Sequence, residues 1–150
     1  MNPAPPRAGD LAAEFLPHTA PFLLLDRIVA IDDAGGRFAK CLTRTDPLLG
    51  PAGVLAPLLM VEAMAQGAGI VLMRREPELR ARGSAVLAAI DRCQVSGSVH
   101  VGDLMLISIT VLRRYGDMAR VRGEASVGDR QCATAALTLA FAPFAGSAAP

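Results

Sequence analysis

The sequence has few of the residues that cross-link a chain or hold a metal ion. It contains three cysteines, Cys41, Cys93 and Cys132, and two histidines, His18 and His100. The cysteines are odd in number, lie far apart and form no C-x-x-C pair, so they fit neither a disulfide framework nor a zinc site. We therefore expect no metal or redox cofactor, and a reducing cytoplasm is the simplest location for the protein.

A strong charge of one sign is also missing. The 150 residues carry 15 basic and 14 acidic side chains, which gives a net charge of +1, and Lys40 is the only lysine. This balance produces no strong field for nucleic acid. The N-terminal M-N-P-A-P-P-R-A-G-D has no basic-then-apolar signal pattern, so we expect no export. With 52% hydrophobic residues, the chain can form one globular domain with its own core.

The longest stretch poor in charge, Ala56 to Met73, has the length of a helix. Between positions 46 and 74 its Glu62 is the only ionisable side chain. Pro57 suits a first helical position, where its missing N–H costs little. Glu62 and Gln66 are four residues apart and therefore point to the same helix face. Whatever packs against that face must satisfy a carboxylate and an amide.

This helix has three interpretations. A carboxylate, an amide and two glycines would be costly in lipid, which argues against a membrane-spanning helix. A core helix whose Glu62 is paired with an arginine is the second. In the third, the helix is covered by a sheet and Glu62 projects into a cleft as an acid or a positioning group. The residues alone leave the last two open.

Strand patterns lie on both sides of the helix. Before it, an apolar run at 22–31 ends in D-D-A-G-G and is followed by a second strand at 36–44. After it, four strands are predicted at 84–91, 103–114, 118–127 and 130–142. In the third of these, polar and apolar residues alternate, as in a sheet with one wet face.

One apolar helix and one antiparallel sheet must cover each other. We therefore predict an α+β fold in which a sheet of about six strands wraps around one long central helix. The expected divisions are a flexible arm at 1–13, the domain at 14–143 and a disordered tail at 144–150. Because an open sheet edge leaves apolar surface to cover, we expect a homo- or heterodimer.

Four strings occur in a family's characteristic order. They are L-P-H-T-A-P-F-L-L-L-D-R at 16–27, V-E-A-M-A-Q at 61–66, V-H-V-G-D-L-M-L at 99–106 and A-T-A-A-L-T-L-A-F-A at 133–142. They resemble the opening signature, central helix, V-x-P-G-D-x-L segment and closing strand of the hot-dog 3-hydroxyacyl-acyl-carrier-protein dehydratases of the bacterial FabZ and FabA type. The similarity covers residues 14–143.

This resemblance implies a substrate held on the phosphopantetheine of an acyl carrier protein, in a tunnel at a dimer interface. In the family, one subunit supplies a histidine from a G-H-F-P loop and a backbone N–H from a P-G step at the helix start. The other subunit supplies a carboxylate from the central helix. The imidazole removes the proton beside the thioester carbonyl, the N–H polarises that carbonyl, and the carboxyl group protonates the departing hydroxyl.

This sequence matches only one half of that pattern. Glu62 and Gln66 stand at the positions of the helix half, but Asp46 to Leu55 is too short to hold G-H-F-P. Pro57 falls on the P-G step, and proline has no N–H to donate. The chain thus resembles the dehydratase-like subunits found beside type II polyketide and aryl-polyene synthases.

We therefore predict that the chain supplies Glu62 to a dehydratase, in fatty acid or polyketide and polyene biosynthesis, that is active with a homologous subunit bearing the histidine. A hot-dog acyl thioesterase or a non-catalytic acyl or scaffold subunit stays open, because the fold does not fix the chemistry.

Other residues have weaker cases. His18 is structural in the family's opening signature, or else serves as a base within this subunit. Phe22, Gln66 and Met60 are expected to contact substrate. Met60, Met64 and Met73 either line an acyl tunnel or are ordinary filling of a buried helix. Four basic residues after the helix either contact an acidic carrier protein or form a solvated loop. They are Arg74, Arg75, Arg80 and Arg82.

Overall fold

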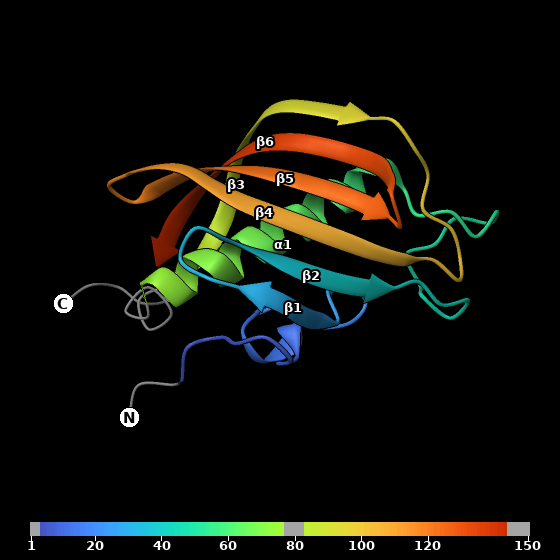
Figure 1. Ribbon diagram of the computed structural model, residues 1–150, viewed down its shortest axis with the longest axis horizontal. Coiled ribbons are helices and arrows are strands. Elements are labelled where there is room, and N and C mark those ends of the chain that lie inside the picture. Colours follow the sequence, from blue (N-terminus) through green and yellow to red (C-terminus); the bar gives the residue numbers. More distant parts are fainter. Residues whose placement is uncertain (1–3, 77–82, 144–150) are drawn as a thin grey trace.

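The computed structural model describes residues 4–76 and 83–143 and consists of one sheet around one helix (Figure 1). A short 3-10 helix, η1 (Ala12–Glu14), comes first. The other elements are β1 (Arg27–Ile31), β2 (Gly35–Cys41), α1 (Pro57–Arg75), β3 (Gly83–Val95), β4 (Leu104–Tyr115), β5 (Met118–Val127) and β6 (Arg130–Pro143). The strands form one antiparallel sheet in the order β1-β2-β4-β5-β6-β3. This arrangement confirms the predicted fold class, with six strands around a long helix.

α1 forms where the apolar stretch predicts it, with Pro57 in its first turn and two arginines in its last. Every residue from Ala63 to Met73 is buried, because the sheet covers the helix. One close approach of helix and sheet needs a glycine: a Cβ on Gly67 would lie 2.9 Å from Cδ2 of Phe38 in β2. Of the described helices, none is long and apolar enough to cross a membrane.

The alternation of polar and apolar residues predicted at 118–127 is confirmed in β5. Ala119, Val121 and Ala125 are buried against α1, while Arg120 and Arg122 are exposed on the opposite face of the sheet. β5 therefore lies in the middle of the sheet with one dry and one wet face.

The first strand is shorter than predicted. The apolar run at 22–31 predicts a strand from Phe22, but β1 begins at Arg27. The reason lies in the hydrogen bonds of the preceding backbone. The N–H of Leu24 donates to Gln66 Oε1, and the carbonyl of Phe22 accepts from Gln66 Nε2. These groups are bonded to the helix and not to a neighbouring strand.

The two edges of the sheet differ. Along β1, residues 9–12 cover the edge with three backbone hydrogen bonds, among them Gly9 N–H to the Ile28 carbonyl at 2.8 Å. β3, at the other edge, pairs only with β6 and exposes Val86, Leu87 and Ile90. The free edge of β3 is therefore the one available to a partner strand. The predicted tail at 144–150 lies outside the described residues.

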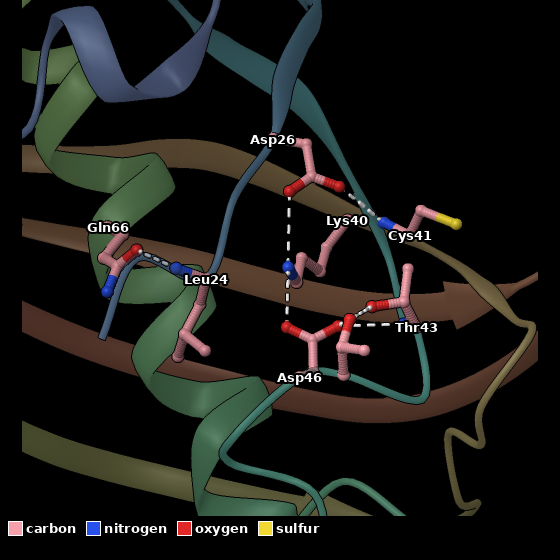
Figure 2. Close-up of polar contacts among 8 residues, drawn as sticks. Leu24, Asp26, Lys40, Cys41, Thr43, Asp46 and Gln66 are labelled. Carbon is pink, nitrogen blue, oxygen red and sulfur yellow. Dashed lines mark hydrogen bonds and ion pairs between the residues drawn. The ribbon is translucent and has the colours of Figure 1, made fainter. Parts of the chain in front are cut away.

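The single lysine joins three segments of the chain (Figure 2). Lys40 Nζ, on β2, lies 3.3 Å from Asp26 Oδ1 and 3.1 Å from Asp46 Oδ1. Asp26 also accepts the N–H of Cys41 at 2.7 Å, and Asp46 accepts the N–H of Thr43 at 2.8 Å. Lys40 thus fixes both the segment before β1 and the start of the loop that leads to α1.

These contacts change the pKa of two groups. Burial alone would lower the pKa of Lys40, whose side chain is 13% exposed, but the hydrogen bonds and charges of Asp46 and Asp26 outweigh it and raise that pKa above 10.5. Burial would likewise raise the pKa of Asp46, but the Thr43 N–H and Lys40 outweigh it and lower that pKa below 3.8. Both shifts favour the charged pair in the folded protein.

We expect Lys40→Met to lower the free energy of unfolding by about 1–3 kcal/mol at neutral pH, because it leaves the Asp46 carboxylate without its cationic partner. The contribution of Asp46 is present above pH 3.8 and lost as the pH falls below that value. The contribution of Lys40 is present below pH 10.5 and lost above it. Urea unfolding across this range measures the effect, with Arg37→Met, an exposed change on β2, as control. Equal losses in the two variants would contradict the role of Lys40.

Candidate active site

A cavity of about 330 Å³ lies between α1, residues 16–22 and the first half of β3. Its polar lining includes His18, Glu62 and Gln66, and most of the remaining lining is apolar. Phe22 stands at its rim and is partly exposed. The cavity therefore brings together four of the residues that the sequence singled out.

A larger hollow of about 580 Å³ lies on the opposite face of the sheet. Two of its three arginines already face carboxylates: Arg120 Nε lies 3.5 Å from Asp91 Oδ2, and Arg122 Nε lies 3.0 Å from Glu124 Oε1. Its lining contains no histidine and no second carboxylate beside Asp91. We therefore place the candidate chemistry in the smaller cavity.

Gln66 holds the polar end of this cavity in one arrangement. Its side chain is buried, and the residue is 2% exposed. Oε1 accepts the N–H of Leu24 at 2.9 Å, while Nε2 donates to the Phe22 carbonyl at 2.8 Å and to Glu62 Oε1 at 3.0 Å. Figure 2 shows the bond to Leu24. Because Oε1 must accept from Leu24, the amide cannot turn over, and its Nε2 always faces Glu62.

Glu62 is held by that amide at the wall of the cavity. Its side chain is 22% exposed, and no arginine in the described part of the chain lies within ion-pair distance of it. The structure therefore favours the helix whose carboxylate faces a cleft over the helix with a paired core carboxylate. Gln66 bonds Oε1, and within the described residues Oε2 has no hydrogen bond. One oxygen is positioned and the other is available to a substrate.

His18 lies close to the carboxylate without bonding it. Its Nε2 is 3.6 Å from Glu62 Oε1, which is too long for a hydrogen bond. The ring stacks on Phe22, with centroids 6.5 Å apart. Nδ1 is buried and finds no hydrogen-bond partner in the described residues. His18 and Glu62 thus place an imidazole and a carboxylate side by side in the cavity, although the histidine ring has no orienting partner in the described residues.

The other candidates lie elsewhere. Met60 is fully buried and is not part of the cavity lining. His100 lies in the turn before β4, with Nδ1 3.8 Å from Asp103. Arg74 donates to the Pro6 carbonyl at 2.7 Å, and its neighbour Arg75 is exposed. Two further arginines, Arg80 and Arg82, lie outside the described residues.

Two features of the site were missed or underrated in the sequence. Gly69 lines the cavity, and so does Met73, which the sequence left as possible core filling. They follow Glu62 by seven and eleven residues, a spacing that returns to the same helix face and could have identified them. In the described parts of the chain, no three histidine, cysteine or carboxylate side chains converge in a way that could hold a metal ion.

We expect Gln66→Met to lower the free energy of unfolding by about 1–3 kcal/mol, chiefly because the buried N–H of Leu24 loses its acceptor. Chemical unfolding in urea checks this. Gln131→Met, at an exposed position of β6, is the matched control and should change stability by less than about 0.5 kcal/mol. If the two variants unfold at the same urea concentration, Gln66 does not hold residues 22–24 to the helix.

Known proteins resemble the chain over nearly its whole length. A sequence model of the ApeP-like family, described as ApeP dehydratase, matches residues 11–144. The 3-hydroxyacyl-[acyl-carrier-protein] dehydratase FabZ of Caldanaerobacter subterraneus subsp. tengcongensis is 32% identical over 134 residues, covering 86% of this chain and 94% of the relative. FabZ of Pelotomaculum thermopropionicum is 36% identical over 134 residues, with 85% and 93% covered.

A solved structure has the same fold. The dehydratase heterocomplex ApeI:P from Xenorhabdus doucetiae superposes with a TM-score of 0.80 at 20% sequence identity, covering 91% of this chain and 93% of that one. The match in fold and the matches in sequence agree with the resemblance seen in the four strings, and they confirm the predicted hot-dog dehydratase. The chain belongs to the ApeP-like dehydratase family.

Proposed function

We propose that this chain is the carboxylate-donating subunit of a heterodimeric 3-hydroxyacyl-acyl-carrier-protein dehydratase. The observation that carries the proposal is Glu62, fixed through Oε1 by Gln66 in a largely apolar cavity. The relatives named FabZ act on 3-hydroxyacyl thioesters of a carrier protein, and the ApeI:P structure is a heterocomplex of dehydratase subunits. We infer that this chain shares both the substrate class and the assembly with a second dehydratase subunit.

The reaction needs one base and one acid on the substrate. A base takes the proton from C2, beside the thioester carbonyl, and the electron pair forms the C2–C3 double bond. The C3–O bond breaks as the carboxyl group of Glu62 gives its proton to the departing hydroxyl, which leaves as water. The products are an enoyl thioester and water, and no external oxidant or reductant is required.

Neither of the chain's two histidines is well placed to act as the base in this step. Of its two histidines, His100 lies in the turn before β4 and does not line the cavity. His18 lines it, but a histidine base is normally oriented through its second nitrogen, and Nδ1 of His18 finds no such partner in the described residues. Pro57, at the start of α1, has no N–H to polarise a carbonyl. We therefore assign the base and the carbonyl-polarising N–H to a homologous partner subunit.

The open edge of β3 offers this partner a place to pair. β3 begins beside the Glu62 cavity, since Ser84 and Ala85 line that cavity, and it exposes three apolar residues further along. A strand added at this edge would cover the apolar side chains and form one side of the cavity mouth, next to Phe22. The β1 edge is already covered by residues 9–12.

The carrier protein would deliver its substrate at the Glu62 end of the cavity, whereas the described arginines of the expected carrier contact lie at the end of α1, beyond Met73. The Arg74 guanidinium donates to the Pro6 carbonyl, and its Nε lies 3.6 Å from Asp33 Oδ1. Arg74 is therefore a weak candidate for carrier contact. Arg75 is exposed, and its charge suits an acidic carrier surface. It lies thirteen residues after Glu62 on α1, however, so it is a weak candidate as well.

We expect the pure chain to be inactive and a mixture with a hot-dog homologue bearing G-H-F-P to dehydrate a 3-hydroxyacyl carrier thioester. Glu62→Gln in the mixture should lower kcat by about 10²–10⁴-fold, the usual contribution of a positioned acid. Glu124→Gln, on the outer face of β5, is the matched control and should leave kcat unchanged. Formation of enoyl thioester, followed by mass spectrometry, measures both. Full activity of Glu62→Gln would contradict the proposal.

A self-sufficient homodimer is the second candidate, and the 3.6 Å between His18 Nε2 and Glu62 Oε1 favours it. In that case His18 is the base, and the pure chain dehydrates the substrate. His18→Asn separates the two candidates, because it should abolish activity of the homodimer but change that of the mixture by less than about tenfold.

A further inference from the structure

We propose that Met73 sets the upper length of the acyl chain that the Glu62 cavity accepts. The inference rests on the proposed function, since it assigns the apolar end of that cavity to the hydrocarbon of the substrate. The specificity would then depend on one flexible side chain, more than two turns of helix beyond the reacting group.

The cavity continues past Met73 into a second one. The second hollow has a volume of about 200 Å³ and lies between Phe15, the end of α1 and the start of β3. Both hollows are lined by the same four residues, so they adjoin. These are Leu16, Pro17, Met73 and Ser84. Met73 therefore stands between the Glu62 cavity and the space behind it.

The two ends of this combined space differ in the polarity of the side chains that line them. At the Glu62 end, Phe22, Val86 and Leu87 are partly exposed, so a carrier-bound pantetheine can enter there. The polar side chains His18, Glu62 and Gln66 lie at this end as well. At the other end, the apolar Met73 and Phe15 are buried, while Glu14 and Pro17 of the second hollow's lining are exposed. A thioester placed with its C3 hydroxyl at Glu62 therefore directs its hydrocarbon along α1 toward Met73.

The helix gives the length of that path. With a rise of about 1.5 Å per residue, Gly69 lies about 10 Å and Met73 about 16 Å beyond Glu62 along the axis. An extended chain advances about 1.2 Å per bond, as the backbone does over its three bonds per residue. A chain that meets Met73 must displace its side chain to grow further. Methionine is unbranched and flexible, which suits a partial barrier.

Gly69 keeps the path open before Met73. A Cβ at position 69 would lie 3.6 Å from the Cβ of Ala85 and 3.9 Å from Cε of Met73, both ordinary contacts. A methyl group there would fit without moving its neighbours and would fill the gap between helix and β3. Gly69→Ala therefore narrows the path while favouring the helix.

The test uses a series of saturated acyl-pantetheine amides of increasing length, which bind but cannot react, titrated into the full chain by calorimetry. Affinity should rise about fourfold per methylene until the chain meets Met73, and then level off. In Met73→Ala the rise should continue for about two or three more methylenes, the length of the side chain removed. In Gly69→Ala it should level off at shorter chains.

Met60→Ala is the matched control, because it removes the same atoms from α1 at a position outside the cavity. The acyl length at which affinity stops rising should be the same in Met60→Ala as in the native chain. The inference is overturned if the acyl length at which affinity stops rising is the same in Met73→Ala and Gly69→Ala as in the native chain. It is also overturned if Met60→Ala shifts that length equally, or if no amide binds. If Met73→Ala does not fold, Gly69→Ala decides. Shifted levelling points without dehydration in any mixture would retain the length limit and reject the proposed chemistry.

Discussion

The structure depends on satisfying two polar side chains on a helix that the sheet buries. An unpaired amide or carboxylate there would cost several kcal/mol, about 1–3 for each unsatisfied group. Gln66 avoids this cost because its amide is hydrogen-bonded to the backbone of Phe22 and Leu24. These bonds hold that segment against α1 instead of in the sheet. The cavity wall, the late start of β1 and the fixed carboxylate all follow from this one side chain.

A second constraint positions the segments on either side of the site. Lys40 links the end of the opening signature, at Asp26, to the start of the loop at Asp46. That loop runs to Pro57, so the lysine on β2 and the proline at the helix start bound the stretch in which the family's histidine loop would stand. The ion pair with Lys40 holds the start of this stretch, which contains no histidine.

The sequence predicted most of the fold because its signals are local and agree with one another. The apolar stretch with Pro57 predicts α1, and the alternation at 118–127 predicts β5 with its correct faces. It failed where a distant contact decides. The apolar run at 22–31 has the composition of a strand throughout, and only the amide of Gln66, 42 residues from Leu24, ends the strand pattern early.

The same limit applies to the site. The spacing of Glu62 and Gln66 predicts a shared face, but whether the carboxylate faces an arginine or a cavity depends on what packs against α1. The approach of His18 to Glu62 joins segments 44 residues apart, and no periodicity predicts it. Gly69 and Met73 were readable as the continuation of the Glu62 face, yet small and apolar residues on a buried helix are common enough to hide them.

In the heterodimer that we propose, the acid that protonates the departing hydroxyl comes from this chain. The most direct measurement uses a histidine-bearing partner whose own helix carboxylate has been replaced by the corresponding amide. The mixture of that variant with the native chain should keep the dehydration rate of the unaltered pair, because Glu62 supplies the proton. Loss of activity in that mixture would contradict the account.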